Sequence, residues 1–96
     1  MRYVLTDEAT ADLREIITYI RKENPDAAKR VRKKFVAAME RLAICPNIGH
    51  RRPDLGDGSL RCWRVYSYLI FYRPDKKPLQ IIHVLHGARD IPRFFE

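Results

Sequence analysis

Two short runs of the sequence place apolar side chains at successive positions, Leu69-Ile70-Phe71 and Ile81-Ile82. Side chains alternate between the two faces of a strand, so a strand built from such a run is apolar on both faces. Water must then be excluded from both sides of the sheet. We expect the segment before the strands to supply one cover, and either the C-terminal segment or a partner chain to supply the other.

The segment before these strands predicts two amphipathic helices joined by a tight turn. Apolar residues recur at helical spacing over residues 9–20 and again over residues 28–42. Thr6 is a suitable N-cap for the first helix, and Asn24-Pro25 suits the start of the second, because asparagine caps and proline fits the first helical position. Pro46 should end the second helix. The result is a helical hairpin.

Three strand-length runs rich in aromatic and β-branched residues follow the hairpin: residues 60–65, 68–73 and 79–85. A short β-prone segment, Arg2–Leu5, precedes it, and the connection over residues 46–59 lacks periodicity and should be irregular. This βααβββ order predicts an α+β fold, a small antiparallel or mixed four-stranded sheet packed on the N-terminal helical hairpin. At 96 residues, we expect residues 1–96 to form a single domain.

Charge is unevenly distributed along the chain. The formal net charge is +7; residues 1–26 carry four basic and six acidic side chains and sum to −2, so the rest sums to +9. Such a field favours an acidic partner, whether nucleic acid, protein or anionic surface. The cations between Lys29 and Lys34 are expected to be mainly a solvated helix face and are a secondary candidate for nucleic-acid binding.

No run approaches the ~18 apolar residues of a membrane helix, and no apolar signal region follows the start. We therefore expect a cytoplasmic protein with no membrane partner. His83 and His86 are three residues apart on a predicted strand, which sends them to opposite faces, and Cys45 and Cys62 lack the spacing of a metal or redox pair. We expect no metal site and no cofactor.

The sequence resembles the ParE branch of the RelE/ParE toxin superfamily, which belongs to type II toxin-antitoxin modules. The resemblance covers essentially the whole chain and rests on the order of short pieces: Leu5-Thr6 with Ala9, Asp12 and Leu13, then Pro46 with Gly49, Leu60-Arg61, Tyr68–Arg73 and His86–Asp90. It implies a RelE/ParE-like toxin domain. It also implies a hetero-oligomeric complex with a cognate ParD-like antitoxin, whose acidic amphipathic C-terminal segment wraps the toxin.

The superfamily has two target classes, and the resemblance bears on the choice. Members similar to RelE cleave mRNA with a cluster of Lys, Arg and Tyr, or His and Glu. In that pattern an arginine follows the tyrosine that opens the third strand, whereas Leu69 follows Tyr68 here, and the basic pair of the preceding strand would fall near Leu60 and Cys62. Arg89 matches a late arginine that both branches share.

The resemblance therefore favours the ParE branch, which is associated with poisoning DNA gyrase by binding, and it implies no catalytic residue. A ribosome-dependent mRNA endonuclease similar to RelE, and a basic nucleic-acid-binding module, stay open as alternatives.

Arginine and tryptophan are frequent interface anchors, and the second half of the chain is rich in arginine. Strand alternation predicts that Arg61 and Trp63 share one face and that Arg64 lies on the other. Structural alternatives stay open: Trp63 could fill core, Arg61 could pair with an acidic residue, and Arg89 could form a local pair with Asp90. The candidate antitoxin- or target-binding residues are Arg61, Trp63, Arg64, Arg73, Arg89 and Arg93.

Overall fold

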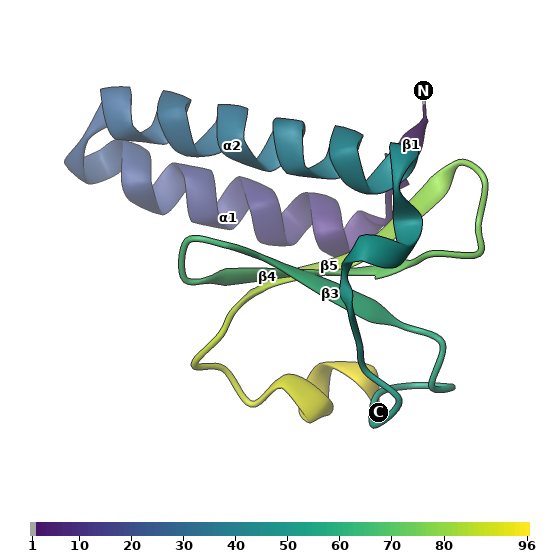
Figure 1. The fold of residues 1–96 in the computed structure, drawn as a ribbon. Helices are drawn as coiled ribbons and strands as arrows, with labels where there is room; N and C mark the ends of the chain where they lie inside the picture. The colour runs from purple at the N-terminus through teal and green to yellow at the C-terminus, as the bar shows by residue number, and fades with distance from the viewer. Residues whose placement is uncertain (1) are drawn as a thin grey trace.

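The structure is a computed structural model, and it describes residues 2–96. Two antiparallel helices, α1 (Asp7–Glu23) and α2 (Pro25–Ile44), cover one face of a sheet, and a short 3-10 helix, η2 (Ile91–Phe95), lies on the other side of it (Figure 1). The strands are β1 (Tyr3–Leu5), β2 (His50–Arg51), β3 (Arg61–Val65), β4 (Tyr68–Arg73) and β5 (Leu79–His86). A second 3-10 helix, η1 (Pro46–Ile48), follows α2.

The helix starts are those that the sequence predicts. The Ala9 amide donates to Thr6 Oγ1 at 3.1 Å, and the Ala27 amide donates to Asn24 Oδ1 at 3.0 Å. Each cap satisfies an amide that has no partner within its helix. Pro25 is the first residue of α2, where its missing N–H costs nothing. The hairpin is therefore fixed by local chemistry at both helix starts.

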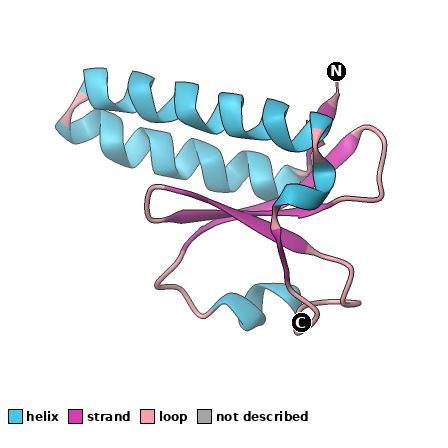
Figure 2. Ribbon diagram, viewed as in Figure 1, coloured by secondary structure: helices cyan, strands magenta, loops and turns pink. Residues whose placement is uncertain are grey.

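The five strands form one mixed sheet in the order β1-β5-β4-β3-β2. Figure 2 shows the strands in magenta beneath the two long helices. β1 runs parallel to β5, and the other neighbours are antiparallel. The α+β fold, a mixed sheet packed on the N-terminal hairpin, is confirmed. The predicted four-strand count omits β2, which pairs His50 with Cys62 and Arg51 with Arg61. Two residues are too few for an alternating pattern to appear in the sequence.

Both faces of β4 are buried, and the chain itself supplies both covers. Ile70 and Tyr72 face α2, where they join a core cluster with Phe35 and Met39. Phe71 faces the opposite side. There it joins a second cluster, whose buried members are Leu55, Leu60, Cys62, Phe71, Leu85 and Ile91. Since Ile91 belongs to η2, the C-terminal segment covers the face that the helices leave open.

Thr6 and Asp12 hydrogen-bond to the outer side of β5, beyond the point where β1 ends. Thr6 donates through its amide to the Ile81 carbonyl at 3.0 Å and through Oγ1 to the Ile82 carbonyl at 2.9 Å. Asp12 Oδ2 accepts the Val84 amide at 3.0 Å and lies 2.7 Å from His83 Nδ1. His83 is thus hydrogen-bonded, and α1 is tied to the strand that it covers.

A buried phenol fixes the connection after α2. Tyr72 Oη accepts the Gly49 amide at 3.0 Å and donates to the Pro46 carbonyl at 2.7 Å. Burial raises the pKa of this phenol, so it stays protonated and able to donate. A β-carbon at Gly49 would collide with the Tyr72 ring and hydroxyl, so glycine is required there. β4 thereby positions η1 and β2.

We predict that Tyr72→Phe destabilises the fold by about 1–3 kcal/mol, because it leaves the buried Gly49 amide without an acceptor. Chemical denaturation would measure the free energy of unfolding. Tyr66→Phe is the matched control: Tyr66 is 55% exposed and its hydroxyl makes no hydrogen bond within residues 2–96, so its effect should stay within about 0.5 kcal/mol. Equal effects of the two variants would contradict the role assigned to the Tyr72 hydroxyl.

Candidate partner-binding groove

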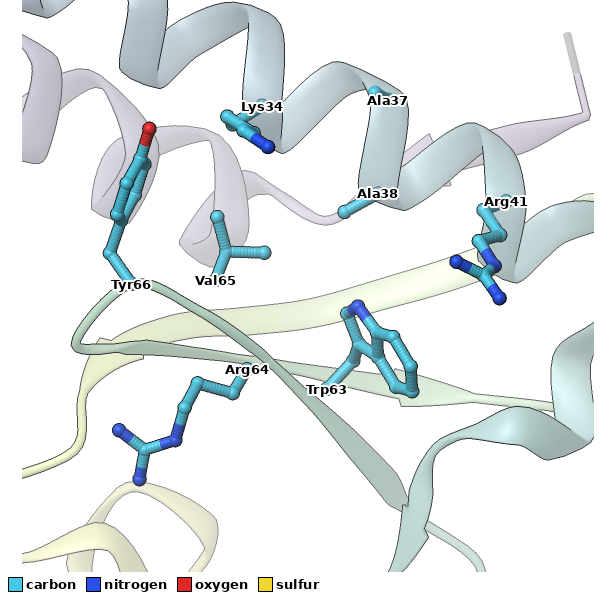
Figure 3. Close-up of a pocket in the computed structure, with 8 residues that line it drawn as sticks. All are labelled: Lys34, Ala37, Ala38, Arg41, Trp63, Arg64, Val65 and Tyr66. Atoms are coloured by element: carbon cyan, nitrogen blue, oxygen red, sulfur yellow. The ribbon is translucent and has the colours of Figure 1, made fainter.

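A groove of about 400 Å³ runs between α2 and β3 (Figure 3). It is lined by residues from one face of α2, from β3 and from the turn that follows: Lys34, Ala37, Ala38, Arg41, Trp63, Arg64, Val65 and Tyr66. Two of the predicted binding residues, Trp63 and Arg64, therefore belong to one site. This groove is the candidate functional site.

The spacing on α2 explains why a groove forms here. Lys34, Ala37, Ala38 and Arg41 recur at helical spacing, so they lie on the same face of the helix. The two alanines are too short to fill the space above β3, and the cations stand on either side of them (Figure 3). Trp63 rises from β3 into this space, half-buried against the core. Its indole is both a core residue and part of the groove.

The groove is cationic. The Cζ of Arg41 lies 5.8 Å from the centroid of the Trp63 ring, a cation–π distance. Arg64 leaves β3 in the direction opposite to Trp63, as strand alternation predicts, and is exposed beside the groove (Figure 3). Lys34 adds a further cation, and no carboxylate is among the lining residues. Such a surface attracts an acidic ligand.

The turn at one end of the groove has an unusual backbone. Tyr66 and Ser67 connect β3 to β4, and Tyr66 has a φ of 55°. A tight two-residue hairpin turn requires positive φ, which bulky residues adopt at a cost. The phenol of Tyr66 is exposed and stands over the end of the groove near Lys34 (Figure 3). An aromatic group is thus exposed to solvent at this position.

Two of the predicted binding arginines instead hold the connection over residues 46–59. Arg61 Nη1 donates to the carbonyls of Gly49 at 2.9 Å and Asn47 at 3.2 Å, so it binds backbone oxygens and not an acidic residue. Arg73 Nη1 donates to Asp57 Oδ2 at 3.1 Å and to Ser59 Oγ at 3.0 Å. These contacts fix the loop that lies between β2 and β3.

The carboxylate of Asp57 is stabilised in its charged form. The Ser59 hydroxyl, the Ser59 amide and the Arg73 guanidinium all donate to it, and in that order they lower its pKa well below the ordinary range. The Asp57 charge is therefore part of the loop structure.

Arg89, in the turn before η2, and Arg93, on η2, are not among the residues that line the groove. The Cζ of Arg89 is 5.0 Å from the centroid of the Phe94 ring, and no ion pair joins Arg89 to Asp90 within residues 2–96. Arg93 is exposed on η2. The predicted binding residues thus separate into a groove pair, a loop-holding pair and a pair in the C-terminal segment after β5.

Arg89 lines a second, smaller cavity of about 230 Å³. His86 and Tyr68 line it too, and their rings meet edge to face with centroids 5.4 Å apart. His86 Nδ1 accepts the Ala88 amide at 3.1 Å, which places the proton of the neutral ring on Nε2. Asp12 and Glu15 add negative charge to the same cavity. The sequence indicated Arg89 but gave no reason to group it with His86 and Tyr68.

Three further features bear on chemistry. Within residues 2–96, no group of His, Cys, Asp and Glu side chains is arranged to hold a metal ion. Cys45 is exposed and Cys62 is buried, and both are free thiols. No helix of the described residues is both long enough and apolar enough to cross a bilayer.

The sequence profile of the family described as the ParE toxin of the type II toxin-antitoxin system parDE matches residues 3–91. The chain belongs to this ParE toxin family. A solved structure from the chromosomal ParDE toxin-antitoxin system of P. aeruginosa shares the fold, with a TM-score of 0.73 and 22% sequence identity over 90% of this chain and 95% of that chain. A comparison with curated proteins found no match.

For a ParE-family chain, the groove contains residues that the sequence did not single out as a site. Lys34 belonged only to the general run of cations, and Arg41 and Tyr66 carried no signal of their own. The available signal is the pair of alanines between Lys34 and Arg41, because small residues flanked by cations at helical spacing leave a charged hollow. The sequence does not show that Trp63 fills part of this hollow, because that depends on how β3 packs against α2 in the folded chain.

We predict that Asp57→Asn weakens the pH dependence of stability in acid. A carboxylate with a lowered pKa stabilises the folded state above its unfolded pKa, and this contribution is lost as the pH falls towards the folded value. The variant should be less stable than the wild type at about pH 6, and the gap should close towards about pH 2. Thermal unfolding would measure it. Asp75→Asn, in the exposed β4–β5 turn, is the control and should show no such convergence.

Proposed function

We propose that this ParE-family toxin is neutralised by a cognate ParD-like antitoxin in a hetero-oligomeric complex and, when free, inhibits DNA gyrase by binding it. Membership of the parDE family supports the antitoxin pairing. The gyrase target follows from the ParE branch, to which the sequence is similar. Residues 1–96 would act as a single RelE/ParE-like toxin domain in the cytoplasm.

The observation that carries the antitoxin proposal is the cationic groove. Lys34 and Arg41 lie on the same side of β3 as Trp63, Arg64 is exposed on the opposite side, and no carboxylate is among the lining residues. An acidic amphipathic segment would place apolar side chains against the indole and carboxylates against the three cations. Trp63 and Arg64 are the antitoxin-binding residues of this proposal, together with Lys34 and Arg41.

The remaining candidate arginines take other roles in the proposal. Arg61 and Arg73 act as positioning residues, since their guanidinium groups are already hydrogen-bonded to the 46–59 connection. Arg89, in the turn before η2, and Arg93, on η2, are exposed and do not line the groove. They are proposed to contact the target, so that the antitoxin and the target would use different surfaces. No catalytic residue and no cofactor is needed for inhibition of this kind.

A second candidate, an mRNA endonuclease similar to RelE, is favoured by one observation. The smaller cavity brings His86 and Tyr68 to Arg89, which are residue types able to transfer protons and to stabilise phosphate charge. Asp12 and Glu15 in the same cavity oppose a polyanionic substrate. We therefore place this candidate second.

We predict that purified toxin blocks supercoiling by gyrase on relaxed plasmid and leaves mRNA intact. Added antitoxin should restore the supercoiling activity. Transcript ends mapped during growth arrest are the control for cleavage. New ends that disappear in both His86→Ala and Arg89→Ala would support the nuclease instead, and no effect on any bacterial topoisomerase would reject the gyrase target.

We predict that Arg64→Glu weakens the toxin-antitoxin complex about tenfold or more, because it places a like charge beside an acidic partner. Calorimetry at two salt concentrations would measure the dissociation constant, and the loss should be larger at low salt. Lys76→Glu makes the same charge change in the exposed β4–β5 turn and should alter the affinity much less. Unchanged affinity for Arg64→Glu would place the interface elsewhere.

A further inference from the structure

The outer face of α2 carries a second group of cations, separate from those of the groove. Four exposed side chains that do not line the groove make up this outer cluster: Lys29, Arg30, Arg32 and Lys33. All but Arg30 line a shallow hollow of about 570 Å³ on the same face, with Glu40 at the C-terminal end of the hollow. The outer cluster is therefore a distinct cationic surface.

The outer cluster is not neutralised by the chain itself. The ion pairs within residues 2–96 lie elsewhere in the structure, and none includes a member of the cluster. Between Asp26 and Glu40 the sequence of α2 contains no carboxylate. Lys29 and Lys33 are one helical turn apart, a spacing at which like charges repel each other. The cluster thus lowers the stability of its own helix unless an anion binds to it.

The cluster belongs to a part of the hairpin that projects beyond the sheet. Lys34 lies near Tyr66, in the β3–β4 turn that ends this side of the sheet (Figure 3). Residues 25–33 lie beyond this point, and Figure 1 shows the joined ends of α1 and α2 extending past the turn. A long rigid partner can therefore lie against the outer face of α2 without meeting the sheet.

The surface around the cluster offers few apolar groups. Within residues 2–96 the exposed large hydrophobic side chains are Val4, Tyr19, Ile44 and Tyr66, and none of them lies between residues 25 and 40. A protein interface relies on aromatic anchors, and a membrane-bound helix inserts an apolar face, but the apolar face of α2 is buried in the core. Phosphate oxygens are bound by cations without such anchors. The surface is thus better suited to a nucleic acid than to a protein or a membrane.

We propose that the outer cluster binds the phosphate backbone of duplex DNA. A helix rises about 1.5 Å per residue, so Lys29 and Lys33 are about 6 Å apart along the axis of α2. Duplex DNA carries one charge per about 1.7 Å of its axis, so about three or four phosphates occupy the same length. The four cations match that number. Contacts to the backbone alone carry no preference for base sequence.

This inference goes beyond the proposed function and needs neither the antitoxin nor gyrase. The groove and the outer cluster are separate sets of side chains on α2. A toxin bound to gyrase would also be close to the duplex on which gyrase acts. Contact with that duplex would add to the affinity of the toxin for the gyrase–DNA assembly, because the second contact is then intramolecular.

Salt-dependent binding of the purified toxin to duplex DNA tests the inference. Fluorescence anisotropy of a labelled duplex of about 20 base pairs would give the association constant at several salt concentrations. Its logarithm should fall linearly with the logarithm of the salt concentration, with a slope of about −3, because about three or four phosphates lose their counterions. Duplexes of unrelated sequence should bind equally well.

A matched pair of double variants separates the position of the charges from their number. Lys29→Gln with Lys33→Gln, and Lys76→Gln with Lys77→Gln in the exposed β4–β5 turn, each remove two positive charges from a net charge of +7. The first pair should weaken binding at low salt about tenfold or more and bring the slope to about −1. The second pair should leave the slope unchanged.

Thermal unfolding would verify that both double variants are folded. Glutamine is a good helix former, and its introduction at positions 29 and 33 removes a repulsion, so this variant should be at least as stable as the wild type. A loss of DNA binding without a loss of stability then assigns the effect to the contact itself.

Three outcomes would overturn the inference. These are no binding to duplex at low salt, equal losses in the two double variants, and tighter binding to vesicles of anionic lipid than to duplex at the same salt concentration. Equal losses would mean that only the net charge matters. A toxin that binds duplex as predicted but does not inhibit gyrase would reject the proposed target and leave this inference standing.

Discussion

The burial of β4 and β5 on both faces is the constraint on which the rest of the structure depends. A helical hairpin can cover only one face, so the chain continues past β5 and folds η2 against the other. The helices must also be held at a fixed height above the sheet. Asp12 does this for α1 by accepting from both His83 and Val84, and Tyr72 does it for the end of α2 through Pro46 and Gly49.

The same constraint determines where a partner can bind. Because both faces of the central strands are occupied, free surface is left at the margins of the sheet. The groove beside β3 is such a margin: α2 covers β4 there but carries alanines above β3, and Trp63 takes up only part of the space. The cations at this margin come from α2, which carries Lys34 and Arg41 on the side of the indole, and from β3, which carries Arg64 on the opposite side. A surface of this kind recognises an acidic segment through contacts to two elements at once.

Local patterns in the sequence predict the elements, because caps, helical periodicity and alternation are short-range properties. Thr6, Asn24 and the doubly apolar run around Ile70 are examples that the structure confirms. The groove could not be predicted from local patterns, since Arg41 and Trp63 are far apart in the chain. They come together only when β3 packs against α2. β2 is similar: two residues become a strand because Arg61 and Tyr72 hold the connection in place. Arg73, predicted to bind a partner, is already hydrogen-bonded to Asp57.

The position of η2 in the chain has a consequence for synthesis. Phe71 and Leu85 are buried under Ile91, and Phe94 and Phe95 pack on the same cluster. β1 is synthesised first, but it cannot join the sheet until its partner strand β5 has been synthesised. During translation the second face of the sheet therefore stays exposed until residues 91–95 have left the ribosome. A truncated product without this segment would expose an apolar face of the sheet. Chaperones and proteases recognise such a face, so the cell would degrade incomplete toxin more readily than full-length toxin.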